Sequence, residues 1–98
     1  MPKIIRISSD IEEIVPGFLE GRAKDVQSLR EFIGSGEIAE IQTIGHKLKG
    51  NSGSYGFDEM GVIGAKIEEA AKQNDVDMII SQTDELEKYL NEIEVEYV

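Results

Sequence analysis

The only histidine of this 98-residue chain, His46, stands in a stretch whose composition favours phosphate chemistry. Lys49 and Gly50 follow it and lie one turn further along if the segment is helical. Residues 41–57 contain no Asp or Glu, although the chain has 20 acidic residues in all. An imidazole is a good nucleophile at neutral pH, and a nearby ammonium group can steady phosphoryl oxygens. The spacing therefore indicates a histidine that carries a phosphoryl group on a ring nitrogen.

The surroundings of His46 also suit this chemistry. The four positions that flank it at three and four residues are small, polar or cationic: Gln42, Thr43, Lys49 and Gly50. Transfer of a phosphoryl group requires the partner's carboxylate to approach in line with the phosphorus, and Gly50 and Gly53 remove side chains where that approach would occur. Because this stretch offers no further acid or base, we expect the partner to bring the metal ion and the acid.

The composition of the whole chain excludes several other kinds of site. It has no cysteine, which excludes disulfides and thiolate metal ligands. One histidine and dispersed carboxylates argue against a zinc or di-iron centre, so we expect no metal and no cofactor in this chain. A formal net charge of −10 disfavours nucleic acid, and no apolar run has the length of a membrane span. We therefore expect one cytosolic domain over residues 1–98.

Most apolar residues recur at intervals of three and four, which is the period of an α-helix. The pattern predicts four helices, over about residues 10–33, 37–53, 58–73 and 75–93. Pro16 either opens the first main helix after a short N-terminal helical extension or kinks a continuous one. Asn74 is expected to cap the fourth helix, and Met78 to lie in the core. Short turns between four helices predict an all-α, antiparallel up-and-down four-helix bundle.

The two ends of the chain depart from the helical period. Isoleucines stand among basic residues at positions 3–7, and apolar residues alternate with acidic ones at positions 93–97. These two segments either pair with each other as short strands or pack beneath the bundle, and the sequence leaves both arrangements open.

Residues 46–56 read His-Lys-Leu-Lys-Gly-Asn-Ser-Gly-Ser-Tyr-Gly and closely resemble the signature of histidine-containing phosphotransfer (HPt) domains. That signature is His-x-Leu-Lys-Gly, followed by small residues and then by an aromatic residue and Gly. The likeness extends to Pro-Gly-Phe-Leu at 16–19 and Ile-Glu-Glu-Ala-Ala at 67–71, so it covers nearly the whole chain. Asn51 departs mildly from the small residue often found at its position.

The resemblance implies that His46 accepts a phosphoryl group from, and donates it to, aspartates of response-regulator receiver domains. In the family the lysine at the position of Lys49 steadies the phosphoryl group, and the glycine at that of Gly50 keeps access clear. The implied partners are receiver domains, which would hold the Mg²⁺, and a hybrid or sensor histidine kinase. Besides the site itself, the residues expected to contact the receiver are Gln42, Thr43, Gly53 and Phe18. Phe18 belongs either to this docking patch or to the edge of the core.

Two alternatives stay open. One is a non-catalytic adapter that binds receivers without transferring phosphate, although such a protein would be expected to have lost His46 or Lys49. The other is the excised phosphotransfer domain of a larger chemotaxis-type histidine kinase, although Met1 favours a freestanding protein. A complete kinase is not expected, because 98 residues leave no room for an ATP-binding domain. We therefore expect a monomeric phosphotransfer protein, not an enzyme with its own ATP site.

Overall fold

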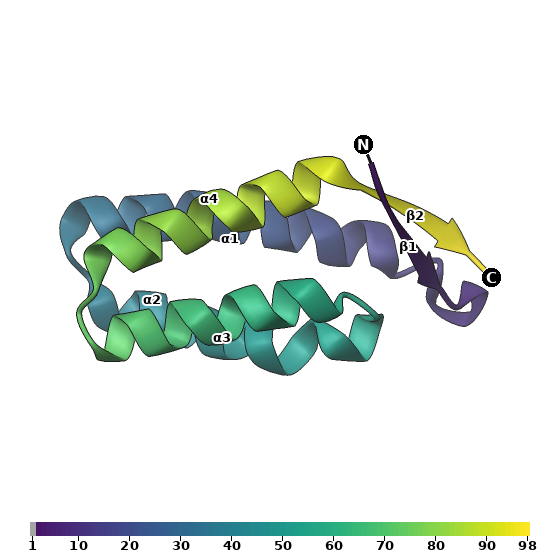
Figure 1. Cartoon of the computed structure of the whole chain (residues 1–98). Coiled ribbons are helices and arrows are strands. Elements are labelled where there is room, and N and C mark those ends of the chain that lie inside the picture. Colours follow the sequence, from purple (N-terminus) through teal and green to yellow (C-terminus); the bar gives the residue numbers. More distant parts are fainter. Residues whose placement is uncertain (1) are drawn as a thin grey trace.

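In the computed structural model, which describes residues 2–98, four α-helices form an elongated bundle of 41 × 25 × 18 Å (Figure 1). The helices are α1 (Val15–Ser35), α2 (Ile38–Asn51), α3 (Asp58–Lys72) and α4 (Val76–Glu92). Each helix packs against its neighbours in the chain, and α1 also packs against α4. Within residues 2–98, no helix has the length and apolar composition needed to cross a membrane. The predicted all-α four-helix bundle is confirmed.

The chain enters α1 through a short 3₁₀ turn, η1 (Ser9–Ile11), and not through a helix that begins near residue 10. The α-helix begins at Val15 and has Pro16 in its first turn, where a missing N–H costs no hydrogen bond. Pro16 therefore opens α1 and does not kink it. Gly36 ends α1 with a φ of 73°, a left-handed conformation that glycine adopts without a steric penalty.

The start of α4 differs from the prediction by one residue. Asn74 does not cap the helix; it has a φ of 54° in the turn after α3. Asp75 is the N-cap, and its carboxylate accepts a hydrogen bond from the backbone N–H of Met78 at 3.1 Å. The prediction of Met78 as a core residue was also wrong, because its side chain is 43% exposed. Ile79, about 100° further round the helix, takes the buried position instead.

The core is formed by one apolar face of each helix and the segment between α2 and α3. Its largest fully buried apolar side chains are Leu29, Ile41, Leu48, Phe57, Met60, Ile67, Ile79 and Leu86. The helices α2 and α3 form the most extensive pair, and they approach each other closely at Gly45 and Gly64. A Cβ atom added to Gly64 would lie 2.5 Å from the Cβ of Leu48, and one added to Gly45 would lie 2.6 Å from the backbone nitrogen of Glu68. These two glycines therefore set the distance between α2 and α3.

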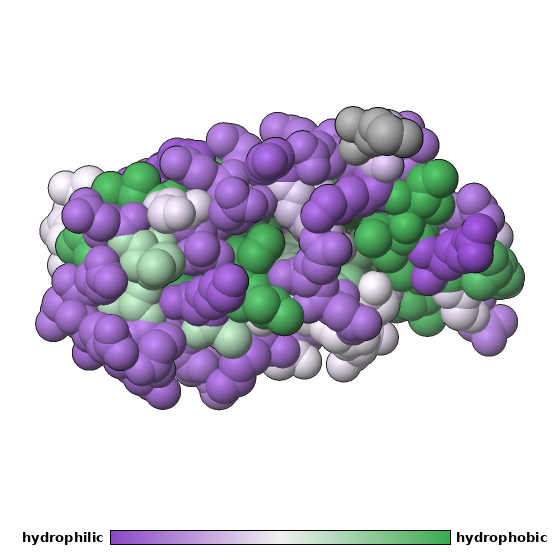
Figure 2. Space-filling model, in the orientation of Figure 1, coloured by the Kyte–Doolittle hydropathy of each residue, from purple (hydrophilic) through white to green (hydrophobic). Residues whose placement is uncertain are grey.

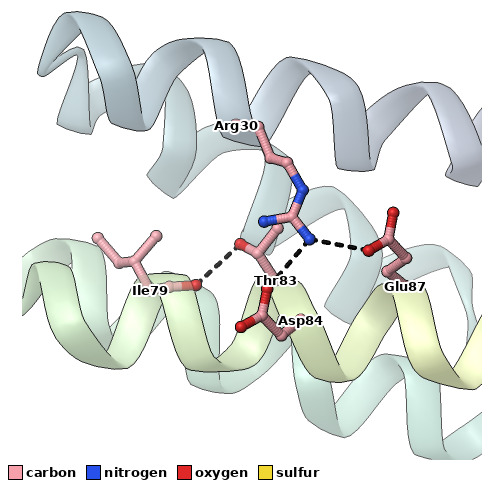
Figure 3. Close-up of polar contacts among 5 residues, drawn as sticks. All are labelled: Arg30, Ile79, Thr83, Asp84 and Glu87. Atoms are coloured by element: carbon pink, nitrogen blue, oxygen red, sulfur yellow. Dashed lines mark hydrogen bonds and ion pairs between the residues drawn. The ribbon is translucent and has the colours of Figure 1, made fainter.

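Polar contacts join α1 to α4 on the surface (Figure 3). Nη2 of Arg30 on α1 lies 3.0 Å from a carboxylate oxygen of Asp84 and 3.0 Å from one of Glu87, both on α4. Beside them, the buried hydroxyl of Thr83 donates a hydrogen bond to the carbonyl of Ile79 at 2.8 Å, so its burial leaves no unpaired polar group. Exposed ion pairs such as those of Arg30 contribute at most about 1 kcal/mol each, so apolar burial is the main force that holds the two helices together.

The two ends of the chain pair as a small parallel sheet at one end of the bundle (Figure 1). Strand β1 (Lys3–Ile7) lies beside β2 (Ile93–Tyr97), with Ile5 opposite Val95. Ile7 is only 2% exposed, so β1 is packed against the core as well as against β2. Of the two arrangements that the sequence left open, the structure has paired strands.

Candidate functional site

The side chain of His46 projects from α2 into solvent. Gly45 and Leu48, on either side of it in the sequence, are buried against the rest of the bundle and fix the rotation of the helix. His46 lies about 100° round the helix from Gly45, and its side chain is 69% exposed. A rigid, packed helix thus presents an accessible imidazole.

One carboxylate from the neighbouring helix joins the two residues that carry the proposed chemistry. Glu68 on α3 places Oε2 at 2.7 Å from Nδ1 of His46 and Oε1 at 2.9 Å from Nζ of Lys49. The Glu68 side chain is only 9% exposed, whereas that of Lys49 is 49% exposed. Glu68 therefore forms a bridge beneath His46 and Lys49, and the close approach of α2 to α3 makes this bridge possible.

The electrostatics of the bridge determine which ring nitrogen is free. Hydrogen bonds from Lys49 and, to a smaller extent, from His46 hold the pKa of Glu68 below its ordinary value, so Glu68 is ionised at neutral pH. An ionised carboxylate can only accept hydrogen bonds. Nδ1 of His46 must therefore carry the proton that it donates to Glu68, and a neutral ring then has its lone pair on Nε2. Nε2 is therefore the ring nitrogen whose lone pair is free.

The glycines beside His46 leave space for a partner. A Cβ atom added to Gly50 would meet no atom within 4 Å, and one added to Gly53 would come only within 3.7 Å of Asp58 Oδ1. By helical period, Gln42, Lys49 and Gly50 lie on the same face as His46, and Thr43 lies beside them. Thr43 is exposed and Gln42 half-buried. The structure thus brings together the α2 residues that the sequence singled out.

Phe18 lies in a stack of aromatic side chains between α1 and the segment that follows α2. Its ring is 4.0 Å from that of Tyr55 and 5.8 Å from that of Phe57, measured between centroids. The guanidinium carbon of Arg22 lies 4.8 Å from the centroid of the Phe18 ring. Phe18 is half-buried in this stack and packs against the core, which favours the interpretation of Phe18 as a core-edge residue.

A second ion pair, on α1, lies near the residue that follows His46. Nε of Arg22 is 2.7 Å from Oδ2 of Asp25, and both side chains are largely shielded from solvent. Burial raises the pKa of Asp25, while the positive charges of Arg22 and Lys47 oppose that rise. The α1 side of the His46 face is therefore mixed in charge, whereas the α3 side has the bridge made by Glu68.

Glu68 is the residue of the candidate site that sequence reasoning missed. It stands 22 residues after His46, in a stretch that the sequence identified only as part of the third helix. A signal was present, because Glu68 lies four residues after Gly64 and next to Ile67, so the helical period places it beside apolar positions of the third helix. A carboxylate there needs a partner, and Lys49 and His46 supply it.

Comparison with known proteins supports the resemblance found in the sequence. A family model described as the Hpt domain matches residues 13–96, which include all four helices and the residues His46, Lys49, Gly50 and Glu68. No curated protein and no solved structure matches the chain.

Proposed function

Because the chain belongs to the Hpt domain family, we propose that it is a phosphorelay intermediate in which His46 carries the phosphoryl group. Membership of this family implies histidine phosphotransfer in two-component signalling. The observation that carries the assignment to His46 is the geometry of its ring. The side chain is 69% exposed, and its Nδ1 is engaged by Glu68 at 2.7 Å, which leaves the lone pair of Nε2 free to act as the nucleophile.

In the proposed transfer, the lone pair of Nε2 attacks the phosphorus of an aspartyl phosphate on a receiver domain. The new N–P bond forms as the O–P bond to the aspartate breaks, and the aspartate leaves as a carboxylate. The ring gains positive charge in this step, and the carboxylate of Glu68 stabilises it through the hydrogen bond from Nδ1. The reverse reaction passes the group from Nε2 to the aspartate of another receiver.

Lys49 and Gly50 are assigned to stabilisation and access. Nζ of Lys49 lies on the surface beside the ring, anchored by one oxygen of Glu68, with donors left for phosphoryl oxygens. Gly50, one turn after His46, has open space around it, which suits the close approach that an in-line transfer requires. We propose that the receiver covers this face of α2, including Gln42, Thr43 and Gly53.

The proposed partners are receiver domains and a hybrid or sensor histidine kinase. The Mg²⁺ and the acid–base groups that the transfer requires are assigned to the receiver, so no cofactor is assigned to this chain. Because the kinase would use ATP, we propose that the phosphoryl exchange takes place in the cytosol. We propose a monomer as the working form.

The proposal is tested by incubating the protein with a panel of purified receiver domains that have been phosphorylated with labelled acetyl phosphate. We expect the label to move to this chain and to be acid-labile and alkali-stable, as a phosphoramidate is. His46→Gln should abolish labelling, whereas Lys47→Gln, which changes the exposed neighbouring residue, should retain it. Labelling that persists in His46→Gln would refute the assignment.

Two other outcomes separate the alternatives. A chain that binds receivers with His46 intact but never becomes labelled would be an adapter. Labelling by ATP alone, with no partner present, would indicate kinase activity and contradict the proposal.

A further inference from the structure

The helices α3 and α4 border a shallow groove that the proposed phosphotransfer does not use. It consists of two adjoining hollows of about 360 and 280 Å³, both of which are lined by Lys66 and Gln82. Apolar side chains line the groove: Val62, Ile63, Ala70 and Met78. Val62 is 55% exposed and Met78 43% exposed, so this apolar surface is accessible. Figure 2 shows apolar atoms in green between the purple polar atoms on the side where α3 and α4 lie in Figure 1.

The groove faces away from His46. On α3, the residue that contacts His46 is Glu68, whereas Lys66 lines both hollows. Two residues along an α-helix correspond to a rotation of about 200°. Lys66 and Glu68 therefore point to opposite sides of α3, so a molecule in the groove would not cover the exposed imidazole.

The rim of the groove is acidic. Four carboxylates and one ammonium group line the two hollows: Glu59, Glu69, Asp75, Glu85 and Lys66. Lys3 offsets part of this charge, since its Nζ lies 2.7 Å from Glu59. The remaining carboxylates leave an excess of negative charge around an apolar strip, which complements a positively charged amphipathic segment.

We propose that this groove binds an amphipathic helix of a partner protein, with lysine or arginine residues beside its apolar side chains. A channel between two antiparallel helices has the shape that admits a third helix. The lining residues run from Glu59 on α3 to Gln73, the C-cap of that helix, a length of about 21 Å at 1.5 Å per residue, which a helix of about 14 residues would fill. A partner bound in this groove would stay attached while His46 exchanges phosphate with receivers. If that partner also carried a receiver, it would raise the effective concentration of the receiver near His46. Binding in the groove goes beyond the proposed phosphotransfer and does not depend on it; only this effect on the exchange rests on the proposed function.

The test uses a 14-residue helical peptide with leucine on one face and lysine on the other, titrated into ¹⁵N-labelled protein. We expect amide shifts to change at Val62, Lys66, Met78 and Gln82 and not at His46. The double variant Glu69→Lys/Glu85→Lys should weaken binding by about tenfold or more, since it reverses two rim charges. Val62→Ser removes apolar surface at an exposed position and should weaken binding without loss of the fold.

The control is Glu20→Lys/Glu31→Lys on α1, which changes the charge by the same amount. Each glutamate-to-lysine change adds two positive charges, so both double variants move the formal net charge from −10 to −6. An equal loss of affinity in the control, or shifts spread over the whole surface, would mean that the peptide responds only to net charge and would overturn the proposal.

A saturating peptide should leave labelling of His46 unchanged. Inhibition of labelling would place the peptide on the His46 face and would also overturn it, whereas failure of labelling without peptide concerns the phosphotransfer alone.

Discussion

Oε2 of Glu68 on α3 lies 2.7 Å from Nδ1 of His46 on α2, although 22 residues separate them in the sequence. The contact depends on Gly45 and Gly64, which let the two helices approach until an added Cβ atom would clash. Since the acceptor is a carboxylate whose pKa is lowered by Lys49 and His46, the proton must lie on Nδ1. The packing of two glycines thus decides which nitrogen of the histidine carries the proton.

In Glu68→Gln, the tautomer of the His46 imidazole should no longer be fixed. A glutamine amide can accept from Nδ1 or donate to it, so the tautomer is no longer fixed and the negative charge that stabilises the phosphorylated ring is lost. We expect phosphotransfer to slow by about tenfold or more, in the range that orienting carboxylates of functional histidines contribute. Imidazole ¹⁵N NMR should show a proton on Nδ1 in the wild type and a mixture of tautomers in the variant. Glu69→Gln, at the exposed neighbouring position, is the control and should change neither measurement.

The carboxylate of Glu68 should also make the free energy of unfolding depend on pH at acidic pH. The pKa of Glu68 is lowered from its ordinary value of 4.5, chiefly by the hydrogen bond from Lys49. Its contribution to folding is therefore fully present above pH 4.5 and is lost as the pH falls through the folded-state pKa. Denaturant unfolding at a series of pH values should show a stability advantage of the wild type over Glu68→Gln at neutral pH that shrinks below pH 4.5. A constant difference between the two proteins would contradict the bridge.

The sequence predicted the helices well because the period of apolar residues carries that information directly. It also predicted the helix that bears His46, since the motif is continuous in the chain. It did not predict the role of Glu68, because that role depends on which residues of α3 meet α2, and this is decided by close packing at Gly45 and Gly64. A residue's position relative to a neighbouring helix is a property of three-dimensional packing, and local periodicity does not specify it.

Smaller differences have local causes. Asp75, and not Asn74, is the N-cap of α4. Asn74 instead takes a left-handed backbone conformation in the preceding turn, which asparagine tolerates better than most residues. Pairing between positions 3–7 and 93–97 joins opposite ends of the chain, and each segment alone was too short to indicate its partner.

Lys49→Ala should affect the phosphorylated state more than the fold. The Lys49 side chain is 49% exposed, and an ion pair in such a position contributes at most about 1 kcal/mol, so the thermal midpoint should change little. Loss of the cation beside the ring should shorten the lifetime of phosphohistidine or slow its transfer, and a chase of labelled protein with unlabelled receiver measures both. Lys47→Ala removes a neighbouring charge that Glu68 does not anchor and is the matched control. Equal effects of the two variants would mean that general positive charge, and not Lys49, acts on the phosphoryl group.

Tyr89 should titrate late and should tolerate loss of its hydroxyl group. Burial, with a smaller effect from Glu59 and Asp58, raises the pKa of Tyr89 to about 12, so its contribution to stability is present below pH 10 and is lost as the pH rises through 12. Ultraviolet titration should show one of the three tyrosines ionising near pH 12, and Tyr89→Phe should remove that step. Because the hydroxyl is buried without a hydrogen-bond partner among the described residues, Tyr89→Phe should be neutral or stabilise by up to about 1 kcal/mol. A clear loss of stability would indicate a partner for this hydroxyl.

Gly50 and Gly64 should respond in opposite ways to an added side chain. A Cβ atom at Gly50 meets no atom within 4 Å, whereas one at Gly64 would lie 2.5 Å from the Cβ of Leu48 and 2.6 Å from the backbone nitrogen of Lys49. Gly64→Ala should therefore destabilise the fold by about 3 kcal/mol, the upper range for overpacking, and move Glu68 away from His46. Gly50→Gln should stabilise the helix by up to about 1 kcal/mol, because glycine is a poor helix former.

Phosphotransfer should nonetheless fall severely in Gly50→Gln. Position 50 stands one turn after His46 on the same face, so a glutamine there occupies space beside Nε2 that the receiver's aspartate must enter. The bridge from Glu68 lies on the other helix and should remain intact, which the ¹⁵N spectrum of the imidazole can verify. A variant with a raised unfolding midpoint, an unchanged tautomer and little transfer would show that access to the ring has been blocked. If Gly50→Gln transferred phosphate at the wild-type rate, the receiver would have to approach His46 from the side of Gln42, and the proposed docking face would be wrong.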